Sequence, residues 1–220
     1  MNKKPLHISI VDNDPELRDM LLLLLGSLGC PMQTFASGIE FLEKADMNAA
    51  GCVILDMDME SRTAGLDVFA EMRACKSPKV VLFLSAYGTI PVALAQTQKG
   101  AFDWLVKPVD GDTLKQRVRE AMLKAQRRSD AKDIWGTLTP REKEVMRLVA
   151  RGMTSKQIAE TLTQKRNPEN DLDSRTVDTF RAAGRDKTGI NNQADMRAWM
   201  IENAWLTDFV DTPVETSLDD

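Results

Sequence analysis

The chain has 220 residues, of which 43% are hydrophobic and 28% are charged, and its formal net charge is −4. This composition is ordinary for a globular protein and allows one large domain or two small ones. The chain contains no apolar run long enough to cross a membrane and no signal-peptide pattern, and its acidic balance argues against indiscriminate coating of nucleic acid. We therefore expect a cytoplasmic protein without a membrane association.

Five short apolar runs occur in the first 125 residues. They do not alternate with polar residues, which is typical of strands that are covered on both faces. Five segments with helical character alternate with them, so we expect an α/β domain over residues 1–125 with a doubly wound, five-stranded parallel sheet. The predicted strands are Leu6–Val11, Met32–Phe35, Cys52–Leu55, Val80–Leu84 and Phe102–Val106.

The three cysteines of this first section, Cys30, Cys52 and Cys75, are unevenly spaced and odd in number. Their spacing fits neither a disulfide framework nor a metal site, and it is compatible with a reducing cytoplasm. We expect them to be small buried hydrophobic side chains.

The composition changes after residue 125. Residues 126–136 are polar and charged and form the predicted linker, residues 137–207 show helical patterns alone, and residues 208–220 form an acidic tail. Residues 139–200 contain 12 basic and 9 acidic residues, whereas residues 201–220 contain six acids and no base. A modestly basic all-α module is compatible with a small DNA-binding domain.

The all-α section contains four signals for helix starts. Thr139–Glu142 combines an N-cap, a proline at the first helical position and the glutamate of a capping box. Thr154–Gln157 repeats the capping box, and Asp173 and Asn192 are predicted N-caps of two further helices.

Polar side chains follow four of the five predicted strands. Because the carboxyl ends of parallel strands meet at one edge of the sheet, these side chains are expected to converge. Clustered oxygens suit Mg²⁺, an aspartate can act as a nucleophile toward phosphorus, and a lysine and a hydroxyl supply charge neutralisation and positioning. The residues are Asp12, Asn13 and Asp14 after the first strand, Asp56 and Asp58 after the third, Ser85 after the fourth and Lys107 after the fifth.

The segments around these residues resemble the receiver domain of bacterial response regulators, which has a flavodoxin-like fold. The matching segments are Val11–Asp14, Val53–Asp56, Leu84–Gly88 and Trp104–Pro108. The resemblance implies that Asp56 accepts a phosphoryl group from a sensor histidine kinase. It further implies self-phosphorylation and autodephosphorylation as the sole chemistry, so we do not expect a free-standing enzyme.

The same resemblance assigns roles to the neighbouring residues. Mg²⁺ would be held by Asp12, Asn13, Asp56 and the carbonyl group of Asp58. Ser85 would donate a hydrogen bond to the phosphoryl group, and Lys107 would pair with it. Trp104 stands at the family's aromatic switch position and would turn inward when Ser85 moves toward the phosphoryl group; a large core residue is the alternative interpretation.

Two features depart from the receiver pattern. Asn13 stands where a second acid is usual, so we expect weaker Mg²⁺ binding. The loop Met57–Gly65 is lengthened and contains Asp58, which would partly compensate for the missing charge or repel the phosphoryl donor. These departures keep open a receiver that regulates through a ligand or a protein contact without phosphorylation.

Residues Leu138–Leu162 and Ser174–Val177 resemble the LuxR/NarL-type helix-turn-helix of FixJ-like regulators. The resemblance implies a recognition helix in the major groove of double-stranded DNA. It also implies a homodimer when phosphorylated, and it makes RNA polymerase a candidate partner. The implied DNA-binding residues are Arg175, Thr176, Asp178, Thr179, Arg181, Ala182, Arg185 and Lys187, of which Asp178, Thr179 and Ala182 face bases and the arginines and Lys187 face phosphates.

This second match also has departures. The segment Thr163–Asp173 is longer than the family's tight turn, Phe180 occupies the usual histidine position, and Gly184 stands where a large apolar residue is usual. They keep open an interaction module with a degenerate helix-turn-helix. The favoured prediction is a transcription factor whose DNA binding is controlled by phosphorylation of Asp56.

Overall fold

The computed structural model describes residues 5–59, 64–86, 100–164 and 172–210. The chain divides into two compact units, Met1–Asp130 and Ala131–Asp220. No helix in the described ranges combines the length and the hydropathy that a membrane span requires. The predicted helix between the fourth and fifth strands, the centres of the two lengthened loops and the tail beyond residue 210 lie outside the described residues.

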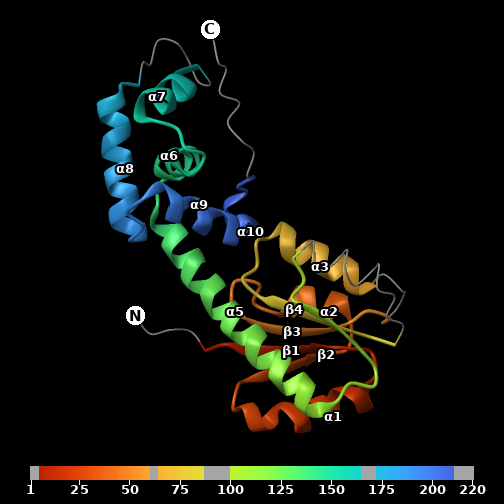
Figure 1. Ribbon diagram of the computed structural model, residues 1–220. Helices are drawn as coiled ribbons and strands as arrows, with labels where there is room; N and C mark the ends of the chain where they lie inside the picture. Colours follow the sequence, from red (N-terminus) through yellow and green to blue (C-terminus); the bar gives the residue numbers. More distant parts are fainter. Residues whose placement is uncertain (1–4, 60–63, 87–99, 165–171, 211–220) are drawn as a thin grey trace. The chain divides into compact units, whose positions relative to one another are not determined.

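The N-terminal unit is built on a five-stranded parallel sheet with the strand order β2-β1-β3-β4-β5 (Figure 1). All five predicted strands are present, with ends that differ from the predictions by one residue at most. Their bounds are β1 His7–Val11, β2 Met32–Phe35, β3 Gly51–Asp56, β4 Val80–Ser85 and β5 Asp103–Val106.

Helices cover both faces of this sheet. Asp14 caps the first of them by accepting hydrogen bonds from the backbone N–H groups of Glu16 and Leu17, and Ser37 caps the second through Glu40. The described helices of this unit are α1 Pro15–Leu25, followed by a 3₁₀ turn at Gly26–Leu28, α2 Gly38–Lys44, α3 Ala64–Ala74 and α5 Gly111–Thr137, whose residues from Ala131 on belong to the C-terminal unit.

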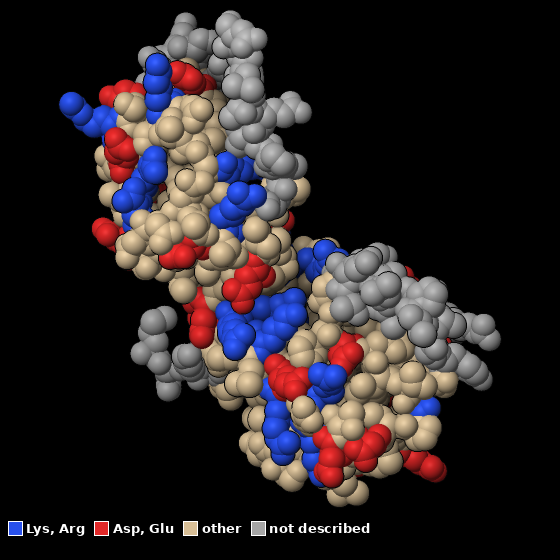
Figure 2. All heavy atoms as spheres, in the orientation of Figure 1, with Lys and Arg blue, Asp and Glu red and all other residues tan. Residues whose placement is uncertain are grey.

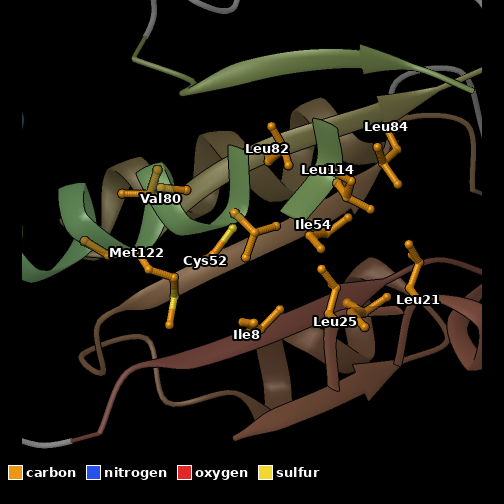
Figure 3. Close-up of a cluster of buried hydrophobic side chains, with 14 of the residues drawn as sticks. Ile8, Leu21, Leu25, Cys52, Ile54, Val80, Leu82, Leu84, Leu114 and Met122 are labelled. Carbon is orange, nitrogen blue, oxygen red and sulfur yellow. The ribbon is translucent and has the colours of Figure 1, made fainter. Parts of the chain in front are cut away.

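The strands distribute their side chains between two hydrophobic clusters. Ile8, Cys52 and Ile54 pack against α1 and α5, as Figure 3 shows for part of this cluster. The alternate residues Val53 and Leu55 pack against α2 and α3 on the opposite face. The central strands β3 and β4 are buried along their whole length, which explains their uninterrupted apolar runs, whereas the edge strand β2 exposes Gln33 and Thr34.

All three cysteines carry free thiols. Cys52 in β3 is fully buried, and burial raises the pKa of its thiol to about 12. Cys30 is half-buried and Cys75 is exposed at the end of α3. The expectation of burial is therefore right for Cys52 and wrong for Cys75, because Cys75 follows the last apolar residue that α3 directs toward the sheet.

The C-terminal unit is helical, and all four predicted helix starts are confirmed. Thr139 and Glu142 form a reciprocal capping box, and Thr154 and Gln157 form a second one. Asp173 and Asn192 accept hydrogen bonds from the backbone N–H groups of Thr176 and Asp195, respectively. The helices are α6 Pro140–Ala150, α7 Ser155–Gln164, α8 Ser174–Thr188, α9 Gln193–Glu202 and α10 Ala204–Thr207.

The predicted linker at residues 126–136 is helical throughout, because α5 continues to Thr137. The segment is polar, but it lacks proline, and its Gln126 side chain donates to Asp130 one turn later. Ala131 and Trp135 are buried in a cluster with Met146 and Met200. The polar composition that predicted a linker thus belongs to the exposed side of an amphipathic helix.

Candidate functional site

The side chain of Lys107 joins the ends of three strands. Its Nζ atom lies 2.8 Å from Oδ1 of Asp56 and 2.9 Å from Oδ2 of Asp12. Both carboxylates are buried, with 2% exposure for Asp12 and 4% for Asp56. The structure therefore brings together the acids that follow β1 and end β3 with the lysine that follows β5.

Burial has the largest effect on the proton affinity of Asp56. It raises the pKa of the Asp56 carboxyl; the hydrogen bond from Lys107 opposes this rise without cancelling it, and the charge of Asp12 adds to the rise. Burial acts on Lys107 in the opposite sense, but the hydrogen bonds to Asp56 and Asp12 outweigh it, so the pKa of Lys107 is raised. Lys107 is thus a stable ammonium beside a carboxylate with an elevated proton affinity.

The loop that follows β3 is fixed by two side-chain hydrogen bonds. Asn13 donates from Nδ2 to the carbonyl oxygen of Met59 at 3.0 Å. Ser85, at the end of β4 and 1% exposed, donates from Oγ to Oδ2 of Asp58 at 3.0 Å. Asn13 and Asp58 are two of the residues that depart from the receiver pattern. Both therefore make specific contacts at the edge of the sheet where the strands have their carboxyl ends, which we call the rim.

The donor set at this rim fits Mg²⁺. Among the described residues, no three or more Asp, Glu, His or Cys side chains are grouped as a self-sufficient metal site. Mg²⁺ needs fewer protein ligands, since it commonly uses one or two carboxylates together with phosphate oxygens and water. Asp12 and Asp56 supply two carboxylates, and Asn13 supplies an amide oxygen whose NH₂ group is held by Met59.

Trp104 lies in β5 and is half-buried. Its ring packs on Phe83 of β4, with 5.2 Å between ring centroids and an interplanar angle of 37°. The indole Nε1 is buried, and no described residue accepts its hydrogen bond. The Trp104 side chain therefore contacts β4, the strand that ends in Ser85, through ring packing, in addition to the backbone pairing of β5 with β4.

The helix α8 has a buried and an exposed side. Val177 and Gly184 are buried, and Phe180 and Arg181 are half-buried. The other predicted DNA-binding residues are exposed, namely Arg175, Thr176, Asp178, Thr179, Ala182, Arg185 and Lys187.

Ser155 at the start of α7 links two of the predicted DNA-binding residues. Its hydroxyl donates to Oδ1 of Asp178 at 2.5 Å and accepts from Nη1 of Arg181 at 2.7 Å. The contact holds α8 against α7. The sequence gave no indication of it, because Ser155 follows the N-cap Thr154 and looks like an ordinary first-turn residue.

Lys187 has a partner inside the unit. Its Nζ lies 2.8 Å and 2.7 Å from the two carboxylate oxygens of Glu142, the residue that completes the capping box of α6. This hydrogen bond is the largest of the causes that lower the pKa of Glu142, and burial opposes it. Lys187 thus ties the end of α8 to the start of α6.

Packing accommodates both unusual apolar positions of α8. A Cβ atom on Gly184 would lie 2.5 Å from Sδ of Met146, so the glycine leaves the space that Met146 fills. Phe180 packs against a buried cluster that contains Val145, Ile158 and Val177. Neither residue disrupts the arrangement of α6, α7 and α8.

Charges on the C-terminal unit are mixed. On the face drawn in Figure 2, its basic side chains are separated by acidic and uncharged ones and form no continuous basic stripe. On α8 itself, Asp178 and Asp186 accompany the exposed Arg175 and Arg185.

The fold and these two regions together define a regulator with a receiver and a DNA-binding domain. The family model for the response regulator receiver domain matches residues 8–119, and the model for bacterial regulatory proteins of the luxR family matches residues 136–200. The chain therefore belongs to the two-component response regulators with a LuxR-type helix-turn-helix.

Individual relatives share this organisation over most of their length. The tetrathionate response regulatory protein TtrR of Salmonella typhimurium is 31% identical and covers 86% of this chain and 89% of its own. The transcriptional regulatory protein FixJ of Bradyrhizobium diazoefficiens is 31% identical, with 90% and 98% coverage. Full-length FixJ from B. japonicum, as a solved structure, has 27% identity and a TM-score of 0.52 over 93% of this chain and all of that chain. The response regulator StyR has 27% identity and a TM-score of 0.53, with 90% and 100% coverage.

Proposed function

We propose that Asp56 accepts a phosphoryl group from a sensor histidine kinase and that this modification controls the binding of the C-terminal unit to double-stranded DNA. The observation that carries the proposal is the position of Lys107, whose ammonium bridges the buried carboxylates of Asp12 and Asp56. We assign the receiver function to residues 1–125 and DNA binding to residues 137–207, with residues 126–136 as a helical connection.

The chemistry that follows is a simple displacement. An oxygen of the Asp56 carboxylate forms a bond to phosphorus while the bond between phosphorus and the donor breaks, and the donor leaves with its electron pair. Lys107 balances the added negative charge, and Ser85 supplies a hydroxyl donor. Asp12, Asn13, Asp56 and the carbonyl group of Asp58 would hold Mg²⁺, which neutralises phosphoryl charge when bound.

The phosphoryl group also acts as a switch in this proposal. Ser85 would move toward it, and Trp104, which packs on the neighbouring strand through Phe83, would turn inward. The change is a population shift, because the phosphoryl group binds one arrangement better than the other. We propose that the phosphorylated form is a homodimer, and that RNA polymerase is a candidate partner at the promoter.

On α8, the exposed residues divide into two proposed classes. Asp178, Thr179 and Ala182 would contact bases, while Arg175, Thr176 and Arg185 would contact phosphates. Arg181 and Lys187 already have the internal partners Ser155 and Glu142, so we assign them a positioning role beside any phosphate contact. Asp178 also accepts a hydrogen bond from Ser155 through Oδ1, so we assign it a positioning role beside its base contact.

Labelling with acetyl phosphate and Mg²⁺ tests the phosphoacceptor. Wild type should gain one phosphoryl group, measured by intact mass, and the Asp56→Asn variant should gain none. Glu71→Ala, an exposed acid on α3, is the matched control and should label like wild type. An unlabelled wild type, or a labelled Asp56→Asn, would refute the assignment.

DNA binding is tested on the DNA upstream of the protein's own gene. Phosphorylated wild type should protect a specific segment in a footprint at lower concentration than Asp56→Asn treated in the same way. Equal protection by both would point to a receiver that acts without phosphorylation.

A further inference from the structure

Ser85 and Asp58 form a contact that the proposed phosphorylation chemistry does not use. Ser85 ends β4 and is buried, and its Oγ donates to Oδ2 of Asp58 at 3.0 Å. Asp58 comes two residues after Asp56 in the loop that follows β3. The hydroxyl assigned to the phosphoryl group is therefore already bound to a carboxylate.

A serine hydroxyl has a single proton to donate. It can donate to Asp58 or to a phosphoryl oxygen on Asp56, but it cannot make both hydrogen bonds at once. Both acceptors are anions, so each would form a charge-assisted hydrogen bond of comparable strength. The two states of the site thus compete for one donor.

The loop holds Asp58 in place for this competition. Met57 and Met59, on either side of it, are each 6% exposed. Asn13 also donates from Nδ2 to the carbonyl oxygen of Met59 at 3.0 Å, which fixes the chain immediately after Asp58. The Asp58 carboxylate is therefore presented to Ser85 by an anchored segment of backbone.

We propose that Asp58 is a positioning residue that retains Ser85 in the unphosphorylated arrangement and so weakens the response of the site to a phosphoryl group. This inference rests on the proposed phosphoacceptor role of Asp56 and extends it to regulation. Removing the Asp58 carboxylate should strengthen binding of a phosphoryl mimic on the order of tenfold, as expected for one hydrogen bond to a charged group.

Repulsion by the negative charge of Asp58 would produce a change in the same direction, so the design must separate the two effects. Asp58→Asn removes the charge but keeps an oxygen acceptor for Ser85, whereas Asp58→Ala removes both. Ser85→Ala removes the donor itself. If Asp58 acts through Ser85, Asp58→Ala should have little effect in the Ser85→Ala background.

The experiment is a double-mutant cycle on the full chain with beryllofluoride and Mg²⁺ as the probe. The dissociation constant is measured by isothermal titration calorimetry for wild type, Asp58→Ala, Asp58→Asn, Ser85→Ala and the double Ala variant, with Glu71→Ala as the control. The expected result is tighter binding by Asp58→Ala, an intermediate value for Asp58→Asn and a coupling of about tenfold with Ser85. Thermal unfolding without the probe confirms that each variant is folded.

The outcomes separate this inference from the proposed function. Binding by wild type with equal gains in both Ser85 backgrounds assigns the effect to charge repulsion and overturns the inference alone. A gain by Asp58→Ala that is absent in the Ser85→Ala background supports the inference, and no gain in either background overturns it. Absence of binding in all folded variants overturns the phosphoacceptor role of Asp56 and the inference together.

Discussion

The rim around Asp12, Asp56 and Lys107 and the helix α8 both contain residues that depart from the family pattern, but the two regions accommodate these departures differently. At the rim, Asn13 and Asp58 are polar, and each makes a hydrogen bond to a specific partner. In α8, Gly184 and Phe180 change apolar volume, and the surrounding core fills or accepts that volume.

The difference shows which departures bear on function. A volume change can be offset by one neighbour, as Met146 offsets Gly184, and the helix arrangement is kept. A new carboxylate is directional and charged, so Asp58 changes what Ser85 is bound to and thereby the chemistry of the site. Polar residues that depart from the family pattern are therefore best tested by their effect on function, and apolar ones by their effect on stability.

The largest expected effect is that of Lys107→Ala at the rim. Removing the ammonium should slow labelling of Asp56 by acetyl phosphate roughly 100- to 1,000-fold. It should also move the acid limb of the rate profile to higher pH. The reason is that Lys107 lowers the pKa of Asp56 against the raising effect of burial, and the nucleophile must be ionised. Labelling rates measured across pH check both effects.

Lys115→Ala is the matched control, since Lys115 lies on α5 and its Nζ is 3.8 Å from the exposed Asp112. It should leave both the rate and the acid limb unchanged. An acid limb that stays in place in Lys107→Ala would contradict the role given to the ammonium.

Gly184→Leu is the corresponding test of packing. Already the Cβ atom would overlap Met146, so the substitution should lower the free energy of unfolding of the C-terminal unit by about 3 kcal/mol. Tryptophan fluorescence during urea unfolding measures the loss, since Trp135, Trp199 and Trp205 report on this unit.

Gly136 provides the control, because a Cβ there meets nothing within 4 Å. Gly136→Ala should be neutral or stabilise the helix by up to about 1 kcal/mol. If Gly184→Leu proved equally neutral, the explanation of Gly184 by Met146 would fail.

Lys187→Ala probes the ion pair between α8 and α6. It leaves the carboxylate of Glu142, 7% exposed, without its cationic partner and should cost about 1–3 kcal/mol, nearer the lower value because the side chain of Lys187 is 35% exposed. The pKa of Glu142 is lowered in the folded state. The ion pair therefore stabilises the folded unit fully at pH values above the ordinary glutamate pKa. This stabilisation is lost as the pH falls through the lowered pKa of Glu142 in the folded state.

Urea unfolding at neutral and at acidic pH measures this loss. Lys187→Ala should be less sensitive to acid than wild type, while Lys156→Ala, an exposed lysine on α7, should follow wild type. Equal acid sensitivity of Lys187→Ala and wild type would assign the pair no part in stability.

The smallest effect concerns the dependence of DNA binding on salt. Arg175→Ala should reduce the slope of log K against log salt concentration by about one unit, as expected for one lost phosphate contact. Lys187→Ala should change the slope less, because its ammonium is held by Glu142. Fluorescence anisotropy at several salt concentrations measures both slopes. Equal changes in the two variants would show that Lys187 contacts a phosphate as Arg175 does.

Local patterns predicted most of the fold. The strands could be predicted from short apolar runs, most clearly β3 and β4, which are buried on both faces. The capping boxes at Thr139 and Thr154 are visible within four residues of sequence. The convergence of Asp12, Asp56 and Lys107 followed from the rule that parallel strands end at one edge.

Contacts between distant residues were not predictable. Asp58 meets Ser85 across 27 residues, and Glu142 meets Lys187 across 45. Such pairs depend on how helices and strands pack, which no local pattern encodes. The helical structure of the predicted linker was missed for a related reason. The burial of Ala131 and Trp135 depends on helices that follow them in the chain.

The buried thiol of Cys52 gives the N-terminal unit a reporter of its own opening. At neutral pH this thiol is protonated, because burial raises its pKa to about 12. An alkylating reagent cannot reach it in the folded unit, because the side chain is fully buried. Cys75 is exposed and should react first. Once Cys75 and Cys30 are blocked, the rate of Cys52 alkylation measures how often β3, the strand that ends in Asp56, separates from its neighbours.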